Sequence, residues 1–264
     1  MEDFIELKLK NDKALLKEQI ISEKRFPVRV SGSDNEEITV IFTPGGDKAI
    51  FDCYLTELSD FIINRYENKL LKRIILSKYK DFMQYQMSDV LSKIYMLEDD
   101  AELGYRARLY TIKTELSEYF KTDKRARVTG LVLFRLPRYI EILEKCSDRM
   151  VESFYTEKEY EEFIGLLKYF VNVQGERPKL IHLYVHKYGM YSVLDENNQD
   201  ITEKCLEDFV GVEDAPYENF DDLLISVLIT LAPEKIVIHN CENIKNKELF
   251  DTIKRVFEKV EYTI

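Results

Sequence analysis

Three histidines carry most of the acid–base and metal-binding potential of this 264-residue chain. His182 and His186 are four residues apart, with Tyr184 between them, in a segment where apolar residues alternate with polar ones. Such alternation is typical of a β-strand, which would place these three side chains on one face. His239 follows a second apolar segment, residues 236–238. We therefore take His182, Tyr184, His186 and His239 as candidate ligand-binding residues.

The spacing of the histidines argues against a zinc site. Four residues of extended strand span about 13 Å, at about 3.3 Å per residue, whereas the ligands of one zinc ion lie about 2 Å from it. His182 and His186 therefore cannot share an ion, and each would need partners from elsewhere, of which His239 is the obvious one. The common fate of a histidine is to be partly buried or solvent-facing with its ring nitrogens hydrogen-bonded. We accordingly predict no metal and no cofactor.

Basic residues are densest just before and within residues 131–140. Arginine forks match phosphate oxygens, so an anion or a nucleic acid could dock there. Against this, 38 basic residues in one chain make local clusters common by chance, and the net charge of −11 argues against broad nucleic-acid binding. A solvated surface is the more ordinary interpretation, and a local patch stays open as an alternative. Its candidate residues are Lys124, Arg125, Arg127, Arg135 and Arg138.

Sequence motifs of other catalytic and phosphate-binding sites are missing from the chain. The pair Gly45-Gly46 lacks the spacing of a phosphate-binding loop, and Ser226 lacks the flanking glycines of a nucleophile elbow. The four cysteines are scattered singly, which favours reduced thiols. The first residues do not resemble a secretory signal, and no apolar stretch approaches the ~20 residues of a membrane span. These features predict a cytoplasmic protein with no membrane insertion.

Residues 1–50 are expected to form a small mixed unit of helix and strand. Apolar and charged residues alternate over residues 4–10, which predicts a half-buried strand, and a helix should follow to about residue 24. Residues 28–30 and 38–42 flank a cluster of turn residues, so they should pair as a hairpin.

Residues 51–174 are expected to be helical nearly throughout. Apolar residues recur there at intervals of three and four, as the buried stripe of a helix requires. Pro137 suits the first turn of a helix, where its missing N–H costs nothing. The stripes should pack together as a bundle; they include Leu55, Leu58, Ile62, Tyr66, Leu70, Ile74, Leu109, Ile112, Leu116 and Tyr119, then Phe163, Leu167 and Phe170.

Residues 175–264 are expected to form a second mixed unit. Two antiparallel strands should come first, at 180–186 and 190–194, followed by a helix at 220–231. The continuous apolar strand 235–239 should lie in the middle of its sheet. A helix at about 246–259 and a last strand at 260–264 complete the pattern. The fold class predicted for the whole chain is α+β.

Three segments carry a resemblance to a known family: LVLFRLPRYI at 131–140, EKEYEEFIGLLKYFV at 157–171 and DLLISVLITLAPEKIVIH at 222–239. With them the chain resembles the YtxC-like family of sporulation-associated proteins, from which it departs at Pro137, where a charged residue is expected. The resemblance implies a cytosolic protein of spore-forming, Gram-positive-type bacteria with a place in sporulation. It implies no reaction and no catalytic or ligand-binding residue.

The absence of a catalytic motif and the resemblance to the YtxC-like family together favour a non-enzymatic protein. Such a protein would act through contacts with an unidentified protein partner. The first alternative is an enzyme or small-ligand binder that uses the histidines, with a pocket between the C-terminal sheet and the helical centre. The second is nucleic-acid binding through the arginine-rich patch, which would show a steep salt dependence.

Overall fold

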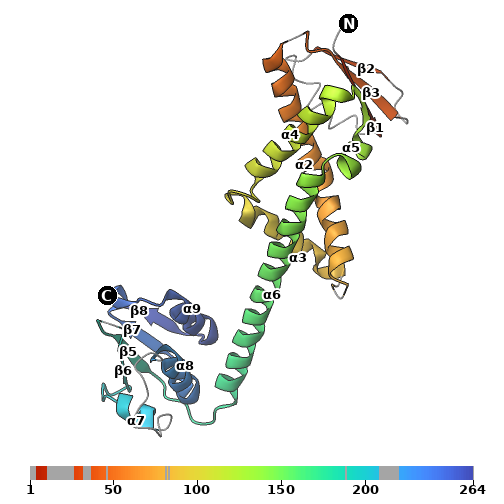
Figure 1. Cartoon of the computed structure of the whole chain (residues 1–264). Coiled ribbons are helices and arrows are strands. Elements are labelled where there is room, and N and C mark those ends of the chain that lie inside the picture. The colour runs from red at the N-terminus through yellow and green to blue at the C-terminus, as the bar shows by residue number, and fades with distance from the viewer. Residues whose placement is uncertain are drawn as a thin grey trace. The chain divides into compact units, whose positions relative to one another are not determined.

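The computed structural model describes residues 4–10, 27–31, 37–45, 47–80, 82, 84–187, 189–207 and 220–263. The chain forms two compact units, residues 1–155 and 156–264 (Figure 1). Each unit contains a four-stranded sheet and packed helices, which confirms the predicted α+β class. The helix predicted to end near residue 24 lies outside the described residues.

The sheet of the first unit has the strand order β2-β3-β1-β4. Strand β3 (Glu37–Phe42) pairs antiparallel with both β1 (Ile5–Lys10) and β2 (Val28–Ser31), so the predicted hairpin of β2 and β3 is confirmed. The short strand β4 (Arg125–Arg127) pairs parallel with β1 and was not predicted, because its sequence shows only basic residues and one alanine.

Helices make up the rest of the first unit. Alternate residues of β1 and β3 enter a core shared with these helices, and the ring of Phe42 stacks on that of Tyr54 at 3.9 Å. Asp47 caps the first long helix, since its carboxylate accepts from the amides of Ala49 and Ile50. The elements are α2 (Lys48–Lys78), η2 (Gln84–Gln86), α3 (Met87–Ser92), η3 (Lys93–Leu97), α4 (Tyr105–Thr122), α5 (Val128–Phe134) and the start of α6 (Pro137–Val173).

A buried polar network joins the long helices inside this core. Arg108 of α4 and Glu67 of α2 form an ion pair at 3.0 Å, and both side chains are almost fully buried. The hydroxyl of Tyr139 also donates to Glu67, at 2.9 Å. Glu115 of α4 accepts from the first free amides of α6, those of Arg138 and Tyr139, so Pro137 opens α6 as predicted.

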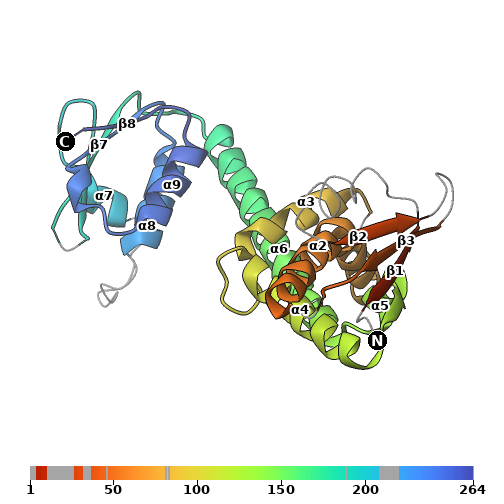
Figure 2. The same ribbon diagram turned by 90° about the horizontal axis from the view of Figure 1, so that it is seen from above.

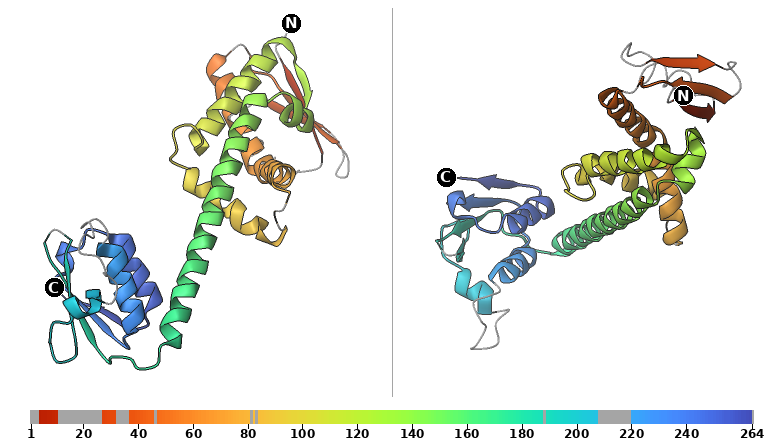
Figure 3. Two further views of the ribbon diagram at one scale, coloured as in Figure 1. Left: turned by 60° about the horizontal axis from the view of Figure 1, so that its bottom comes forward. Right: turned by 45° about the horizontal axis from the view of Figure 1, so that its top comes forward.

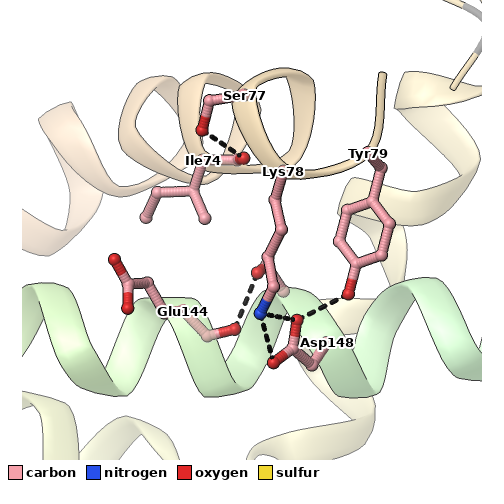
Figure 4. A network of polar contacts seen from close by, with 7 residues as sticks. Ile74, Ser77, Lys78, Tyr79, Glu144 and Asp148 are labelled. Carbon is pink, nitrogen blue, oxygen red and sulfur yellow. Dashed lines mark hydrogen bonds and ion pairs between the residues drawn. The ribbon is translucent and has the colours of Figure 1, made fainter. Parts of the chain in front are cut away.

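A second polar contact ties the end of α2 to α6 nearer the surface. Lys78 donates to both oxygens of Asp148, at 2.6 and 2.7 Å, and the hydroxyl of Tyr79 donates to the same carboxylate at 2.5 Å (Figure 4). The two donors come from the last turn and the C-cap of α2. The contact therefore sets where α2 ends against α6.

The sheet of the second unit has the order β6-β5-β7-β8. Strand β5 (Ile181–Val185) pairs antiparallel with β6 (Tyr191–Leu194) and parallel with β7 (Ile236–His239). Strand β8 (Val260–Tyr262) lies parallel to β7 at the edge. The interior position predicted for the apolar strand at 235–239 is confirmed.

Helices cover one face of this sheet. Helices α8 (Phe220–Leu231) and α9 (Lys247–Val256) lie side by side against it (Figures 2 and 3). Ile181, Leu183 and Val185 of β5 point into the same core, which also takes in the last turns of α6. The predicted strands and both of these helices are confirmed, while α7 (Thr202–Glu207) and the short η5 (Cys241–Asn243) were not predicted.

One predicted stripe on α6 is wrong. Leu167 is buried, but Phe163 and Phe170 are 49% and 44% exposed. The core of the second unit instead receives Ile164, Leu167 and Val171. These residues also follow helical spacing, so α6 carries two apolar stripes, and only one of them is buried in this core.

Two further features of the described residues concern the cysteines and the composition of the helices. All four cysteines lie in the described residues, and none of them forms a disulfide bond. Among the helices of the described ranges, none combines the length and the apolar composition needed to cross a bilayer.

Candidate functional site

The open face of the second sheet carries the histidines. Side chains on β5 alternate, so that Ile181, Leu183 and Val185 are buried under the helices while His182 and Tyr184 are half-buried on the other face. Parallel pairing sets Tyr184 beside His239 of β7. The register therefore brings two residues together that are more than fifty positions apart in the sequence.

His182 and His239 are in direct contact. The Nδ1 atom of His182 lies 2.9 Å from Nε2 of His239, and Nδ1 of His239 lies 2.8 Å from the hydroxyl of Thr263. The ring of Tyr184 stacks on that of His239, with centroids 4.2 Å apart and planes 10° apart. We call His182 and His239 the histidine pair.

The hydrogen bonds leave one ring nitrogen of the pair available. Both nitrogens of His239 are engaged, whereas Nε2 of His182 has no hydrogen bond to any residue in the described ranges. That atom can accept or donate one hydrogen bond to a ligand. Which of the two it does depends on the tautomer set by the hydrogen bonds that run from Thr263 through His239 to His182. The site therefore offers one polar anchor beside an aromatic surface.

The electrostatics of the pair disfavour a second positive charge. Burial lowers the pKa of His239, and the nearby charge of His182 lowers it further. Two imidazolium rings in contact would repel each other strongly. His239 is therefore harder to protonate than an ordinary histidine, which suits it to hydrogen bonding as a neutral ring.

His186 lies apart from the pair. Its Nε2 atom is 2.8 Å from the hydroxyl of Ser192 on β6. Within the described ranges, no group of three or more histidine, cysteine, aspartate or glutamate side chains is placed to hold a metal ion. Of the four candidate residues on this sheet, the structure thus brings together His182, Tyr184 and His239. Thr263 was missed, because nothing in its sequence context marks it as a partner of a histidine.

The candidate anion-binding residues lie in the first unit, where several make internal contacts. Arg125 pairs with Glu6 at 3.1 Å, and Arg138 pairs with Glu118 at 2.9 Å. The guanidinium of Arg135 lies over the ring of Tyr119, at 5.8 Å from its centroid. Lys124 and Arg127 also have interactions within the chain. Much of the positive charge of this patch is therefore used by the protein itself.

An exposed apolar surface on α6 was not foreseen. Five large side chains lie on the last turns of the helix with exposed fractions between 44% and 63%, and the rings of Tyr169 and Phe170 touch edge to face. The signal was present in the sequence, but spacing alone does not say which of two apolar stripes faces the core. We call this surface the α6 ridge; it consists of Phe163, Leu166, Tyr169, Phe170 and Val173.

Comparison with known proteins bears on the whole chain. The family model of YtxC-like proteins matches residues 52–261, which is most of the sequence. The chain belongs to the YtxC-like family. The match includes the histidine pair and the α6 ridge of this YtxC-like protein. None of the curated proteins and none of the solved structures with which the chain was compared matches it significantly.

Proposed function

We propose that this YtxC-like protein acts by binding another protein through the α6 ridge. The observation that carries the proposal is the exposure of five large apolar side chains on about three turns of one helix. Exposed apolar side chains that cluster in one place mark interaction surfaces in soluble proteins, because covering them releases ordered water. The buried face of the same helix segment packs into the core of the second unit, and this packing holds the ridge in place.

The spacing of the ridge suits a helical or grooved partner. Phe163, Leu166, Phe170 and Val173 recur at intervals of three, four and three, which places them along one line of the helix. A partner with a complementary apolar groove or helix could cover this line. We place this contact in the cytoplasm and, on the strength of the family resemblance, in sporulation.

Site-specific photo-crosslinking in sporulating cells tests the proposal. A photoreactive residue replaces Leu166 on the ridge, and in a control chain it replaces Glu159, which is exposed on an earlier turn of α6. We expect a discrete crosslinked product from position 166 alone. The double variant Leu166→Ser/Phe170→Ser should bind the partner at least tenfold more weakly and reduce the yield of heat-resistant spores. No product at position 166, or equal products at both positions, would refute the proposal.

A second candidate function is binding of a small ligand at the histidine pair. It is favoured by the unused Nε2 atom of His182 beside the stacked rings of Tyr184 and His239. Such a ligand would shift the ring C–H signals of His182 and His239 in an NMR spectrum and leave those of His186 in place. Equal shifts at all three histidines would indicate a general effect and count against this function.

A further inference from the structure

A cavity of about 410 Å³ lies within the second unit. Its walls come from the last turns of α6, the C-terminal end of α9, and the connections at residues 233–234 and 257–259. Cavities of roughly 300 to 1,000 Å³ are of the size that small ligands occupy in proteins. The cavity is formed by different residues from those of the histidine pair and the α6 ridge.

The lining of this cavity is basic, although the chain as a whole carries a net charge of −11. Five cationic side chains line it, against the two carboxylates of Glu234 and Glu258. The cationic residues are Lys168, Arg177, Lys254, Arg255 and Lys259. A local excess of positive charge in an acidic protein attracts anions to that place.

Two of the five cations already have partners. Arg255 forms an ion pair with Glu161, and Arg177 donates to the backbone carbonyl of Val171 near the end of α6. The ammonium groups of Lys168, Lys254 and Lys259, in contrast, have no ion pair or hydrogen bond with any residue that the structure describes. These three lysines are therefore free to bind an anion.

Stabilisation of helix ends explains only part of this pattern. Lys254 and Arg255 lie in the last turn of α9, and Arg177 caps α6, where cations offset the partial negative charge of about half a unit at each helix end. Lys168 and Lys259 lie outside the last helical turns, so helix stabilisation does not account for them. The partial negative charges of two helix ends are also too small to neutralise the five cationic side chains.

The base of the cavity is apolar. Val171, Pro233, Val256 and Phe257 line it and are buried. An apolar base lowers the local dielectric constant, which strengthens the attraction between a lysine and an anion. It also provides a surface for the carbon-containing part of a ligand.

We propose that this cavity binds a small organic phosphate, with Lys168, Lys254 and Lys259 holding the phosphate and the apolar base holding the rest of the molecule. Phosphate fits because it carries up to two negative charges and several acceptor oxygens, which three ammonium groups can share. The size of the cavity limits the ligand to a small molecule, such as a mononucleotide or a sugar phosphate.

Titration calorimetry of the full chain tests the site with three probes: inorganic phosphate, pyrophosphate and AMP. We expect AMP to bind more tightly than inorganic phosphate, because only AMP uses the apolar base. The variant Lys168→Gln/Lys259→Gln should weaken AMP binding about tenfold or more, since it removes two charged contacts. The matched control Lys158→Gln/Lys247→Gln makes the same change of charge on α6 and α9 away from the cavity, and it should bind AMP as the parent does.

The outcomes separate a built site from general attraction of anions. Equal loss of binding in the cavity variant and the control would overturn the proposal, as would the absence of binding of all three probes at millimolar concentration. Pyrophosphate binding without AMP binding would also overturn it, because the apolar base would then have no part. The replaced lysines are exposed, so both variants should keep the thermal midpoint of the parent.

Discussion

At the scale of single residues, the contact between His182 and His239 makes the second unit sensitive to pH. The rings lie within hydrogen-bonding distance, and the pKa of His239 is lowered by burial and by the charge of His182. In the unfolded chain the two rings separate, and the pKa of His239 returns to its ordinary value of 6.5. The folded protein is therefore harder to protonate at this place than the unfolded chain.

This difference predicts a loss of stability in mild acid. As the pH falls below about 6.5, the unfolded state binds more protons than the folded state, so the free energy of unfolding decreases. The contribution of His239 is fully present above that pH and is lost as the pH falls toward its lowered pKa. The variant His239→Gln removes the titrating ring and should flatten the pH dependence of hydrogen exchange in β5 and β7. His186→Gln is the control, because His186 contacts Ser192 rather than the pair; an equal effect of both variants would contradict this account.

The candidate site was predictable from the sequence only in part. Alternation along residues 180–186 predicted that His182 and Tyr184 share one face of a strand, and both are half-buried there while the residues between and beside them are buried. The rise of an extended strand predicted that His182 and His186 cannot share a zinc ion, and His186 contacts Ser192 rather than His182. The contact between His182 and His239 depends on the parallel register of β5 and β7, which no local pattern specifies. Thr263 directly follows β8, the strand paired with β7, so its contact with His239 depends on tertiary structure alone.

At the scale of elements, α6 shows why helical spacing is an incomplete guide. Residues 160–173 contain two apolar stripes, and both satisfy the three- and four-residue rule. Which stripe is buried depends on where the sheet of the second unit lies, and that is a long-range property. The edge strand β4 was missed for a related reason, since three residues with basic ends have no pattern of their own and become a strand by pairing with β1.

The turn before α4 depends on one glycine. A Cβ atom at Gly104 would lie 2.3 Å from the carbonyl oxygen of Asp100 and 2.6 Å from that of Glu98. Both are backbone atoms, which cannot move aside as a flexible side chain could. Gly104→Ala should therefore lower the free energy of unfolding by about 1–3 kcal/mol, the usual cost of overpacking.

The matched control for this change is Gly130→Ala in α5. No atom lies within 4 Å of the added Cβ at that position, so the variant should gain about 0.5–1 kcal/mol of stability from its better helix propensity. The measurement is the midpoint of thermal unfolding for both variants and the parent. A Gly104→Ala protein as stable as the parent would show that the turn relaxes at little cost.

At the scale of the whole molecule, the described residues form two hydrophobic cores. Residues such as Phe42, Leu58 and Leu143 belong to the core of the first unit, whereas Ile181, Leu228 and Ile253 belong to that of the second. A core of its own is what allows part of a protein to open independently. Helix α6 runs from one unit into the other, so a loss of stability in the first unit has a continuous helix along which to spread.

Hydrogen exchange of the Gly104→Ala protein measures this spread. Gly104 lies in the first unit, and the three atoms nearest to an added Cβ are backbone oxygens of that unit. Exchange should therefore speed up by about tenfold for each 1.4 kcal/mol lost in α4 and the first half of α6. Amides of β5 and β7 are held by the sheet of the second unit and should exchange at the rate of the parent. Equal acceleration in both units would mean that α6 couples them into one cooperative structure, and the α6 ridge would then report on the state of the first unit as well as the second.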